Sequence, residues 1–267
     1  MKIIVIANQK GGVGKTTTTM NLAAGLKLAG KKVLVIDSDP QANLTSYLGV
    51  EPGSEAYPGL RTLDEMYLSK RDLETHEKKA FIAKTQSGLD LIPSDGALSG
   101  VEYYLFSRSD KEGLLQEFLW DLAPEYDFVL IDTPPAMNLI TLNAMVAADE
   151  VLIPVQPEFF GLEGISKLKA SIDDVRRRWN PRLKILGILP SLVSGRRKLT
   201  SEVLSVLSAE FGNLVFETQI HDNASVTEST GHGQSVFEYD RKSKGANDFQ
   251  KAADEVIRRL SAEGVQK

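Results

Sequence analysis

The sequence of 267 residues contains no cysteine. This absence excludes disulfides, thiolate zinc sites and iron–sulfur clusters held by cysteine. Histidine is scarce, at three residues. Neither His221 nor His232 has carboxylates beside it at the spacing of metal ligands, so we expect surface or loop roles for both and assign them no function.

Long hydrophobic runs are also missing. No apolar run reaches the length of about 18 residues that a membrane-spanning helix needs, and the N-terminus enters a strand without a charged leader. We therefore expect a cytoplasmic protein that neither spans a membrane nor is secreted. The composition, 42% hydrophobic and 25% charged, is ordinary for a soluble domain. The net charge of −5 argues mildly against general nucleic-acid binding, although a local basic face would suffice for it.

A glycine-rich loop directly follows the apolar run 3–7. Three glycines in four positions let successive N–H groups turn toward an anion, and Lys15 adds a point charge for the outer phosphates. The hydroxyl of Thr16 is of the kind that ligates Mg²⁺, and the apolar periodicity from Met20 onward indicates a helix whose N-terminus faces the same anion. This strand–loop–helix order favours a phosphate-binding loop over a turn that binds nothing. The predicted nucleotide-binding residues are Lys10, Gly11, Gly12, Val13, Gly14, Lys15, Thr16 and Thr17.

The loop departs from the common P-loop pattern in two places. Gln9 stands where the first glycine belongs, and Lys10 places a second lysine inside the loop. The run from Lys10 to Thr17 resembles the deviant nucleotide-binding loop of the ParA/MinD branch of P-loop ATPases. In that branch the first lysine acts across a dimer interface, which implies catalytic roles for both Lys10 and Lys15.

Strand and helix patterns alternate along the chain, which predicts one α/β domain over residues 1–267. The strands are apolar on both faces, as in a parallel sheet covered on both sides, so we expect a doubly wound, mainly parallel sheet with its ligand at the carboxyl ends of the strands. The expected strands beyond the first are 32–37, 89–93, 127–132, 150–155 and 183–189. The expected helices are 16–28, 61–68, 97–106, 111–122, 138–148, 164–179, 199–211 and 244–260, and 48–58 is expected to be a loop.

Three aspartates end buried strands. Asp132 is expected to help hold the Mg²⁺ that Thr16 ligates, because a carboxylate at the tip of a neighbouring strand commonly does so. Asp39 is our candidate for placing the water that attacks the γ-phosphate, and Asp37 is expected to be structural or to support the metal site indirectly. The alternative is that these aspartates only terminate strands before Pro40 and Pro134.

Further blocks extend the resemblance over nearly the whole chain to the ParA/Soj partition ATPases. They are 35–41, 130–135, 153–158, 162–164 and 239–246. The resemblance implies an enzyme that hydrolyses ATP with Mg²⁺ and dimerises with two nucleotides between the subunits. It also implies nonspecific binding of the ATP dimer to double-stranded DNA, nucleoid association, a ParB-like activator of hydrolysis, and a chromosome, plasmid or protein cargo.

A basic stretch could supply the DNA surface. From Val175 to Leu199 there are eight lysines and arginines and no acidic residue. Backbone phosphate contacts of this kind give affinity without base reading. Arg196 is the best candidate, because Gly195-Arg196 falls where family members carry a DNA-contacting arginine. The alternative for 176–178 is that these arginines only supply favourable charge at a helix C-terminus.

One segment departs from the family. Soj-like chains carry Pro-Arg-Asn-x-Arg after the strand near Ile220, whereas residues 221–225 here read His-Asp-Asn-Ala-Ser. Asn223 is kept, and the resemblance implies that it lies near the adenine. Because both arginines are absent, we expect DNA binding to depend on Arg196, Arg197, Lys198 and Arg241.

Two other functions remain open. A membrane-cycling ATPase of the MinD type would end in a basic amphipathic helix, but acidic residues dilute the charge of the last helix, so we expect this helix to dock onto the sheet. A metabolic P-loop enzyme, such as an amidotransferase-linked synthase, should carry a substrate domain or a nucleophile, and we find neither.

Overall fold

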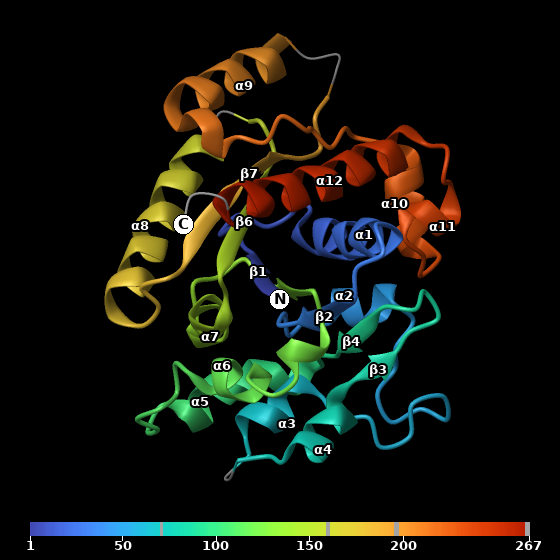
Figure 1. Cartoon of the computed structure of the whole chain (residues 1–267), viewed down its shortest axis with the longest axis vertical. Helices are drawn as coiled ribbons and strands as arrows, with labels where there is room; N and C mark the ends of the chain where they lie inside the picture. The colour runs from blue at the N-terminus through green and yellow to red at the C-terminus, as the bar shows by residue number, and fades with distance from the viewer. Residues whose placement is uncertain (70–71, 159–160, 195–197, 265–267) are drawn as a thin grey trace.

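The computed structural model describes residues 1–69, 72–158, 161–194 and 198–264. Within them the chain forms a seven-stranded sheet in the order β3-β4-β2-β5-β1-β6-β7 (Figure 1). Every pair is parallel except β3 and β4 at one edge, so the doubly wound, mainly parallel sheet is confirmed. The strands are β1 (Lys2–Ile6), β2 (Val33–Asp37), β3 (Ala83–Lys84), β4 (Asp90–Ile92), β5 (Phe128–Asp132), β6 (Glu150–Val155) and β7 (Lys184–Pro190).

Successive strand residues point into two separate hydrophobic cores. In β1, Val5 belongs to the core on one face, and Ile4 and Ile6 belong to the core on the other. Side chains alternate across a strand, so a continuous apolar run can face two covered surfaces. Helices therefore cover both faces of the sheet.

The first face packs against helices from the middle of the chain. Leu63, Leu115, Ile140 and Ile172 share one core with the facing strand residues. The helices on this face belong to the longer connections between strands, and Figure 1 shows most of them below and to the left of the strands. These helices are α3 (Leu63–Tyr67), α5 (Val101–Leu105), α6 (Leu114–Leu119), α7 (Leu139–Ala147), α8 (Gly161–Arg178) and α9 (Lys198–Phe211).

The second face packs against the N-terminal and C-terminal helices. Phe249 and Val256 of the last helix are buried in the same core as Leu22 of the first. Figure 1 shows these two helices side by side. A Cβ on Gly25 would lie 3.0 Å from the Cβ of Ala253, so the two helices approach closely at this point. The helices are α1 (Lys15–Leu28), α2 (Asn43–Tyr47), α10 (Ala224–Gly231), α11 (Val236–Tyr239) and α12 (Lys244–Gly264).

The last helix thus docks as expected, although it packs on α1 as well as near β7. Its apolar stripe is covered by these neighbours, and its acidic residues Asp248 and Glu255 make hydrogen bonds to the segment before α10. Among the described residues, no helix combines the length and apolar character needed to cross a membrane.

The short elements differ from the sequence-based prediction. The strand β3 and the helices α2, α4 (Thr75–Lys78), α10 and α11 were not predicted, because eight or fewer residues carry little periodicity. The expected helix over 97–106 is instead a 3₁₀ segment, Gly96–Gly100, followed by α5. The expected helix over 111–122 is shorter, because α6 begins after Gly113.

Candidate nucleotide-binding site

The glycine-rich loop lies between the end of β1 and the start of α1. Gly12 and Gly14 have φ values of 74° and 84°, a left-handed conformation that other residues rarely adopt. No atom lies within 4 Å of a Cβ built on either glycine, so backbone conformation rather than space demands glycine here. Gly14 caps α1 without any side-chain hydrogen bond, which leaves the first N–H groups of the helix directed at the loop. This backbone can hold an anion.

Polar contacts from neighbouring strands hold the loop in place. The side-chain amide of Asn8 donates to the Pro154 carbonyl at 2.8 Å, and its oxygen accepts from the Lys10 amide at 2.9 Å. The Ser191 hydroxyl donates to the Val13 carbonyl at 2.8 Å. Asn8 and Ser191 were not predicted from the sequence, although Asn8 lies two residues after β1 and Ser191 directly follows β7, both at the carboxyl edge of the sheet.

Lys15 is the cation of the loop. Its residue is only 7% exposed, and its ammonium donates to the Lys10 carbonyl at 3.4 Å. Burial lowers the pKa of Lys15, and this effect is opposed by the nearby charges of Asp132 and Asp39. A desolvated ammonium is stabilised by an anion brought close to it, which fits a phosphate in the loop.

Thr16 and Asp132 are in direct contact. The Thr16 hydroxyl donates to Oδ2 of Asp132 at 2.7 Å, and the Thr19 hydroxyl lies 3.3 Å from Oδ1. Burial, together with the charge of the neighbouring Asp37, raises the pKa of Asp132 to about 8. A hydroxyl beside a carboxylate is a suitable oxygen pair for Mg²⁺.

A cation at this point would also need oxygens from outside the protein. Among the described residues, no group of three or more histidines, aspartates or glutamates is arranged to hold a metal. Mg²⁺ commonly combines one or two protein oxygens with substrate phosphates and water. The Thr16–Asp132 pair beside a phosphate-binding loop fits that kind of site.

Asp37 and Asp39 follow β2 but have different surroundings. Asp37 is fully buried, and its Oδ2 accepts hydrogen bonds from the amide and the hydroxyl of Thr45, each at 2.8 Å. Burial raises the pKa of Asp37 to about 6. Asp39 is 8% exposed, and its Oδ1 accepts from the Gln41 amide at 2.9 Å. Asp37 thus joins the start of α2 to the sheet, whereas Asp39 lies in the loop between β2 and α2.

The side chain of Lys10 forms an ion pair with Glu158. Its ammonium lies 2.7 Å from Oε2 of Glu158, in the segment that follows β6. Both side chains are about two-fifths exposed, so the pair lies at the surface of the site. Lys10 is therefore held within its own chain in this structure.

Asn223 begins α10 beside the end of β7. Its side-chain oxygen caps the helix by accepting from the Ser225 amide at 3.0 Å. The preceding His221 forms a bridge with Val193, two residues beyond the Ser191 that holds the glycine-rich loop. The segment carrying Asn223 is thereby joined to the edge of the sheet where the loop lies.

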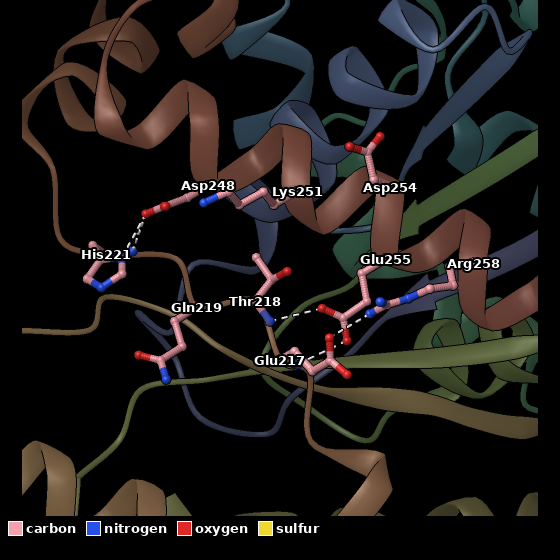
Figure 2. A pocket seen from close by; sticks show the side chains of 9 residues that line it. All are labelled: Glu217, Thr218, Gln219, His221, Asp248, Lys251, Asp254, Glu255 and Arg258. Carbon is pink, nitrogen blue, oxygen red and sulfur yellow. Dashed lines mark hydrogen bonds and ion pairs between the residues drawn. The ribbon is translucent and has the colours of Figure 1, made fainter.

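Residues 217–221 and α12 together line a cleft of about 510 Å³ (Figure 2). The His221 amide and Nδ1 both contact Oδ2 of the buried Asp248, at 3.1 and 2.8 Å. A Cβ on Gly245 would lie 3.3 Å from Oδ1 of Asn223. The sequence indicated no function for His221. In the structure it is the hydrogen-bond partner of Asp248 and holds the residues before Asn223 against α12.

The predicted DNA-contacting residues come from two segments, 196–198 and the turn before α12. Arg196 and Arg197 lie outside the described residues, Lys198 is the first residue of α9, and Arg241 is exposed in the turn before α12. Arg176 and Arg177 form ion pairs with Asp173 and Asp174, one helical turn earlier. Acidic residues that pair with this basic stretch therefore lie immediately before Val175, where the stretch begins.

Comparison with known proteins identifies the family. A family model described as an AAA domain matches residues 1–185. The Caulobacter vibrioides chromosome partitioning protein ParA is 39% identical over 261 residues, covering 97% of this chain and 95% of the relative. The Bacillus subtilis sporulation initiation inhibitor protein Soj is 38% identical over 255 residues, covering 96% and 98%. The chain belongs to the ParA/Soj family.

The ParA/Soj fold is also found in solved structures. Cobyrinic acid a,c-diamide synthase from Mycobacterium smegmatis, solved with bound ADP and magnesium, is 33% identical with a TM-score of 0.83, and the match covers 98% of this chain and 96% of that one. A synthase can therefore have the length of a ParA/Soj chain. We expected a metabolic enzyme to carry an additional substrate domain, but the lack of one does not distinguish a metabolic enzyme from a partition ATPase.

Proposed function

We propose that the protein is an ATPase that binds ATP with Mg²⁺ and converts it to ADP and phosphate. The observation that carries this proposal is the Thr16–Asp132 hydrogen bond of 2.7 Å beside the glycine-rich loop and the buried Lys15. The loop, the cation and the oxygen pair supply the three elements that phosphoryl transfer needs: a cradle, a countercharge and a metal site. The ADP and magnesium bound to the M. smegmatis relative support the same assignment.

The residues of the site divide this chemistry among them. The backbone N–H groups of 11–16 and the ammonium of Lys15 bind the phosphates, while Thr16 and Asp132 hold Mg²⁺. When bound, Mg²⁺ neutralises charge that develops on the phosphate oxygens. Asp39 orients the attacking water, and Asp37 positions the β2–α2 loop through Thr45. Asp132 must lose its proton to serve as a ligand, because burial keeps its pKa near 8 before the cation arrives.

ATP would also control assembly. In the proposed homodimer, Lys10 leaves Glu158 and reaches the phosphates bound to the partner subunit. The contact favours the dimer only when a triphosphate is present, so nucleotide binding shifts the population toward it. The surface position of Lys10 supports this role, because an exposed ion pair of this kind contributes only about 0–1 kcal/mol.

We further propose that the ATP dimer binds DNA nonspecifically in the cytoplasm, at the nucleoid, and that a ParB-like protein stimulates hydrolysis. The names of the C. vibrioides and B. subtilis relatives support a role in partition, with a chromosome, a plasmid or a protein assembly as cargo. The candidate contacts remain Arg196, Arg197, Lys198 and Arg241.

Electrophoretic mobility of nonspecific duplex DNA tests this proposal. Wild-type protein with ATP and Mg²⁺ should retard the DNA at low salt, and retardation should weaken steeply as salt rises. Arg196→Ala should weaken it and Lys32→Ala, an exposed lysine before β2, should not. Absence of retardation with ATP at low salt would overturn the DNA proposal while leaving the ATPase to be measured separately.

The membrane-cycling alternative is tested by co-sedimentation with anionic liposomes. The docked apolar face of α12 predicts no ATP-dependent sedimentation. Binding to liposomes but not to DNA would favour the MinD-type function instead.

A further inference from the structure

The segment that leads from β7 into α10 is fixed to the strand end that also holds the glycine-rich loop. The Ile220 amide donates to the Pro190 carbonyl at 2.8 Å, and the Asp222 amide donates to the Val193 carbonyl at 3.2 Å. Ser191, between these two acceptors, is the residue whose hydroxyl donates to the loop. One side of the segment is therefore anchored beside the phosphate-binding part of the site.

The other side of this segment faces α12. Asp248, near the start of α12, is only 5% exposed. Its Oδ2 accepts from the His221 amide at 3.1 Å and lies 2.8 Å from Nδ1 of the same residue (Figure 2). Among the described residues Asp248 has no other hydrogen-bond or ion-pair partner. A buried carboxylate without partners is costly, so His221 alone satisfies this charge.

His221 stands at a position where this chain departs from the family. Soj-like chains typically carry proline there, and proline has neither an N–H group nor a polar side chain. Both contacts with Asp248 are therefore impossible for the residue that is usual in the family. The pair is a feature of this chain rather than a requirement of the fold.

Asn223 follows two positions after His221 and keeps an unused hydrogen-bond donor. Its Oδ1 accepts from the Ser225 amide at 3.0 Å, and among the described residues its Nδ2 has no partner. The first turn of α12 lies directly against it, because a Cβ on Gly245 would clash with Val226 and lie 3.3 Å from Oδ1 of Asn223. Adenine has ring nitrogens that accept hydrogen bonds, which suits an amide donor held in a fixed position.

We propose that His221 and Asp248 are a positioning pair for the adenine of the bound nucleotide. The pair holds the segment against α12 and thereby sets the position of Asn223, while the loop binds the phosphates independently. This inference rests on the proposed binding of MgATP and concerns its nucleoside half alone. The pair therefore contributes to the affinity for ATP but not to the affinity for a ligand that has phosphates and no base.

Calorimetric titration with two ligands tests this inference. The ligands are MgATP and magnesium tripolyphosphate, which has the phosphates without the nucleoside. We expect His221→Leu and Asp248→Ala each to weaken MgATP binding at least fivefold, because the base contact is no longer preorganised. Binding of tripolyphosphate should stay within twofold of the wild type. Because the two residues act through one contact, the double variant should bind MgATP no more weakly than the weaker single variant.

A conservative variant and a matched control sharpen the test. His221→Asn keeps a side-chain donor at the place of Nδ1 and should restore MgATP affinity to within twofold of the wild type. Arg258→Ala breaks an exposed ion pair of 2.8 Å with Glu217, which joins the same segment to α12 at the other end of the cleft (Figure 2). Glu217 lies six positions before Asn223, so this loss should change neither affinity by more than twofold.

Three results would overturn the inference. The first is unchanged MgATP affinity in His221→Leu and Asp248→Ala. The second is equal weakening of MgATP and tripolyphosphate binding, which would mean that the pair only stabilises the fold. The third is a wild-type protein that binds MgATP no more tightly than tripolyphosphate, which would mean that the base is not recognised. A wild-type protein that does not bind MgATP at all would instead refute the proposed ATPase, so the two failures are distinguishable.

Discussion

The ammonium of Lys10 lies 2.7 Å from Oε2 of Glu158, in the segment that follows β6. The lysine that the family resemblance assigns to the partner subunit's phosphates is thus occupied within its own chain. In the proposed dimer this contact has to be replaced, so Glu158 would compete with the second nucleotide for Lys10. Because both side chains are partly exposed, their ion pair is expected to contribute only about 0–1 kcal/mol.

Removing the charge of Glu158 should favour assembly. Glu158→Gln frees Lys10 in the monomer, and we expect half-maximal dimerisation at up to about fivefold lower ATP concentration, the equivalent of about 1 kcal/mol. Light scattering after size separation measures this shift. Glu217→Gln, which breaks the exposed pair with Arg258, is the control. Loss of dimerisation in Glu158→Gln would mean that the carboxylate belongs to the dimer interface.

Removing Lys10 should have the opposite effect. Lys10→Ala is expected to bind ATP nearly as the wild type does, because Lys15 remains, but to stay monomeric. The mass in solution with and without ATP gives the answer, with Lys32→Ala as the control for loss of one positive charge. A mass that still doubles with ATP in Lys10→Ala would contradict the assignment of this lysine to the partner's phosphates.

Asp39→Ala should retain ATP and hydrolyse it at least tenfold more slowly, because the water loses its orienting group, and the dimer should accumulate. Phosphate release and mass are measured together. Asp39→Asn keeps an oxygen that can accept from the Gln41 amide, so it separates the lost charge from a disturbed loop. Normal turnover in both variants would remove Asp39 from the mechanism.

The raised pKa of Asp132 predicts a pH-dependent stability in the absence of metal. Between its ordinary value of 3.8 and about 8, the folded state holds a proton that the unfolded state releases, so stability falls as pH rises through this window. The expected loss is about 1.4 kcal/mol per pH unit from one such proton. The free energy of unfolding, measured with urea at several pH values from 5 to 8, should fall less with pH in Asp132→Asn than in the wild type. An equal dependence on pH in the two proteins would show that Asp132 ionises normally.

The patterns that predicted the long elements also indicated the candidate site residues. Buried parallel strands are continuous apolar runs, and Asp37 and Asp132 are the polar residues that end two of them. Because β2 and β5 are paired in register, these two aspartates become neighbours in the sheet. Thr16 meets Asp132 because β1 lies beside β5 in the sheet.

Other features depend on contacts between distant segments that carry no local pattern. Asn8 and Ser191 hold the loop through the Pro154 and Val13 carbonyls, from strands far apart in the sequence. Glu158 belongs to block 153–158 of the family resemblance, but its contact with Lys10 is visible only in the folded chain. Trp120, directly after α6, and Trp179, directly after α8, are 59 positions apart in the sequence and line one cleft only in the fold.

Calorimetric titration of MgATP into wild type, Lys15→Ala and Asp132→Ala tests the assignment of the nucleotide site most directly. We expect saturable binding to the wild type, a loss of affinity of at least tenfold in Lys15→Ala, and in Asp132→Ala a loss that appears with Mg²⁺ and largely disappears without it. Unchanged MgATP affinity in Lys15→Ala would contradict the assignment of this loop as the nucleotide site.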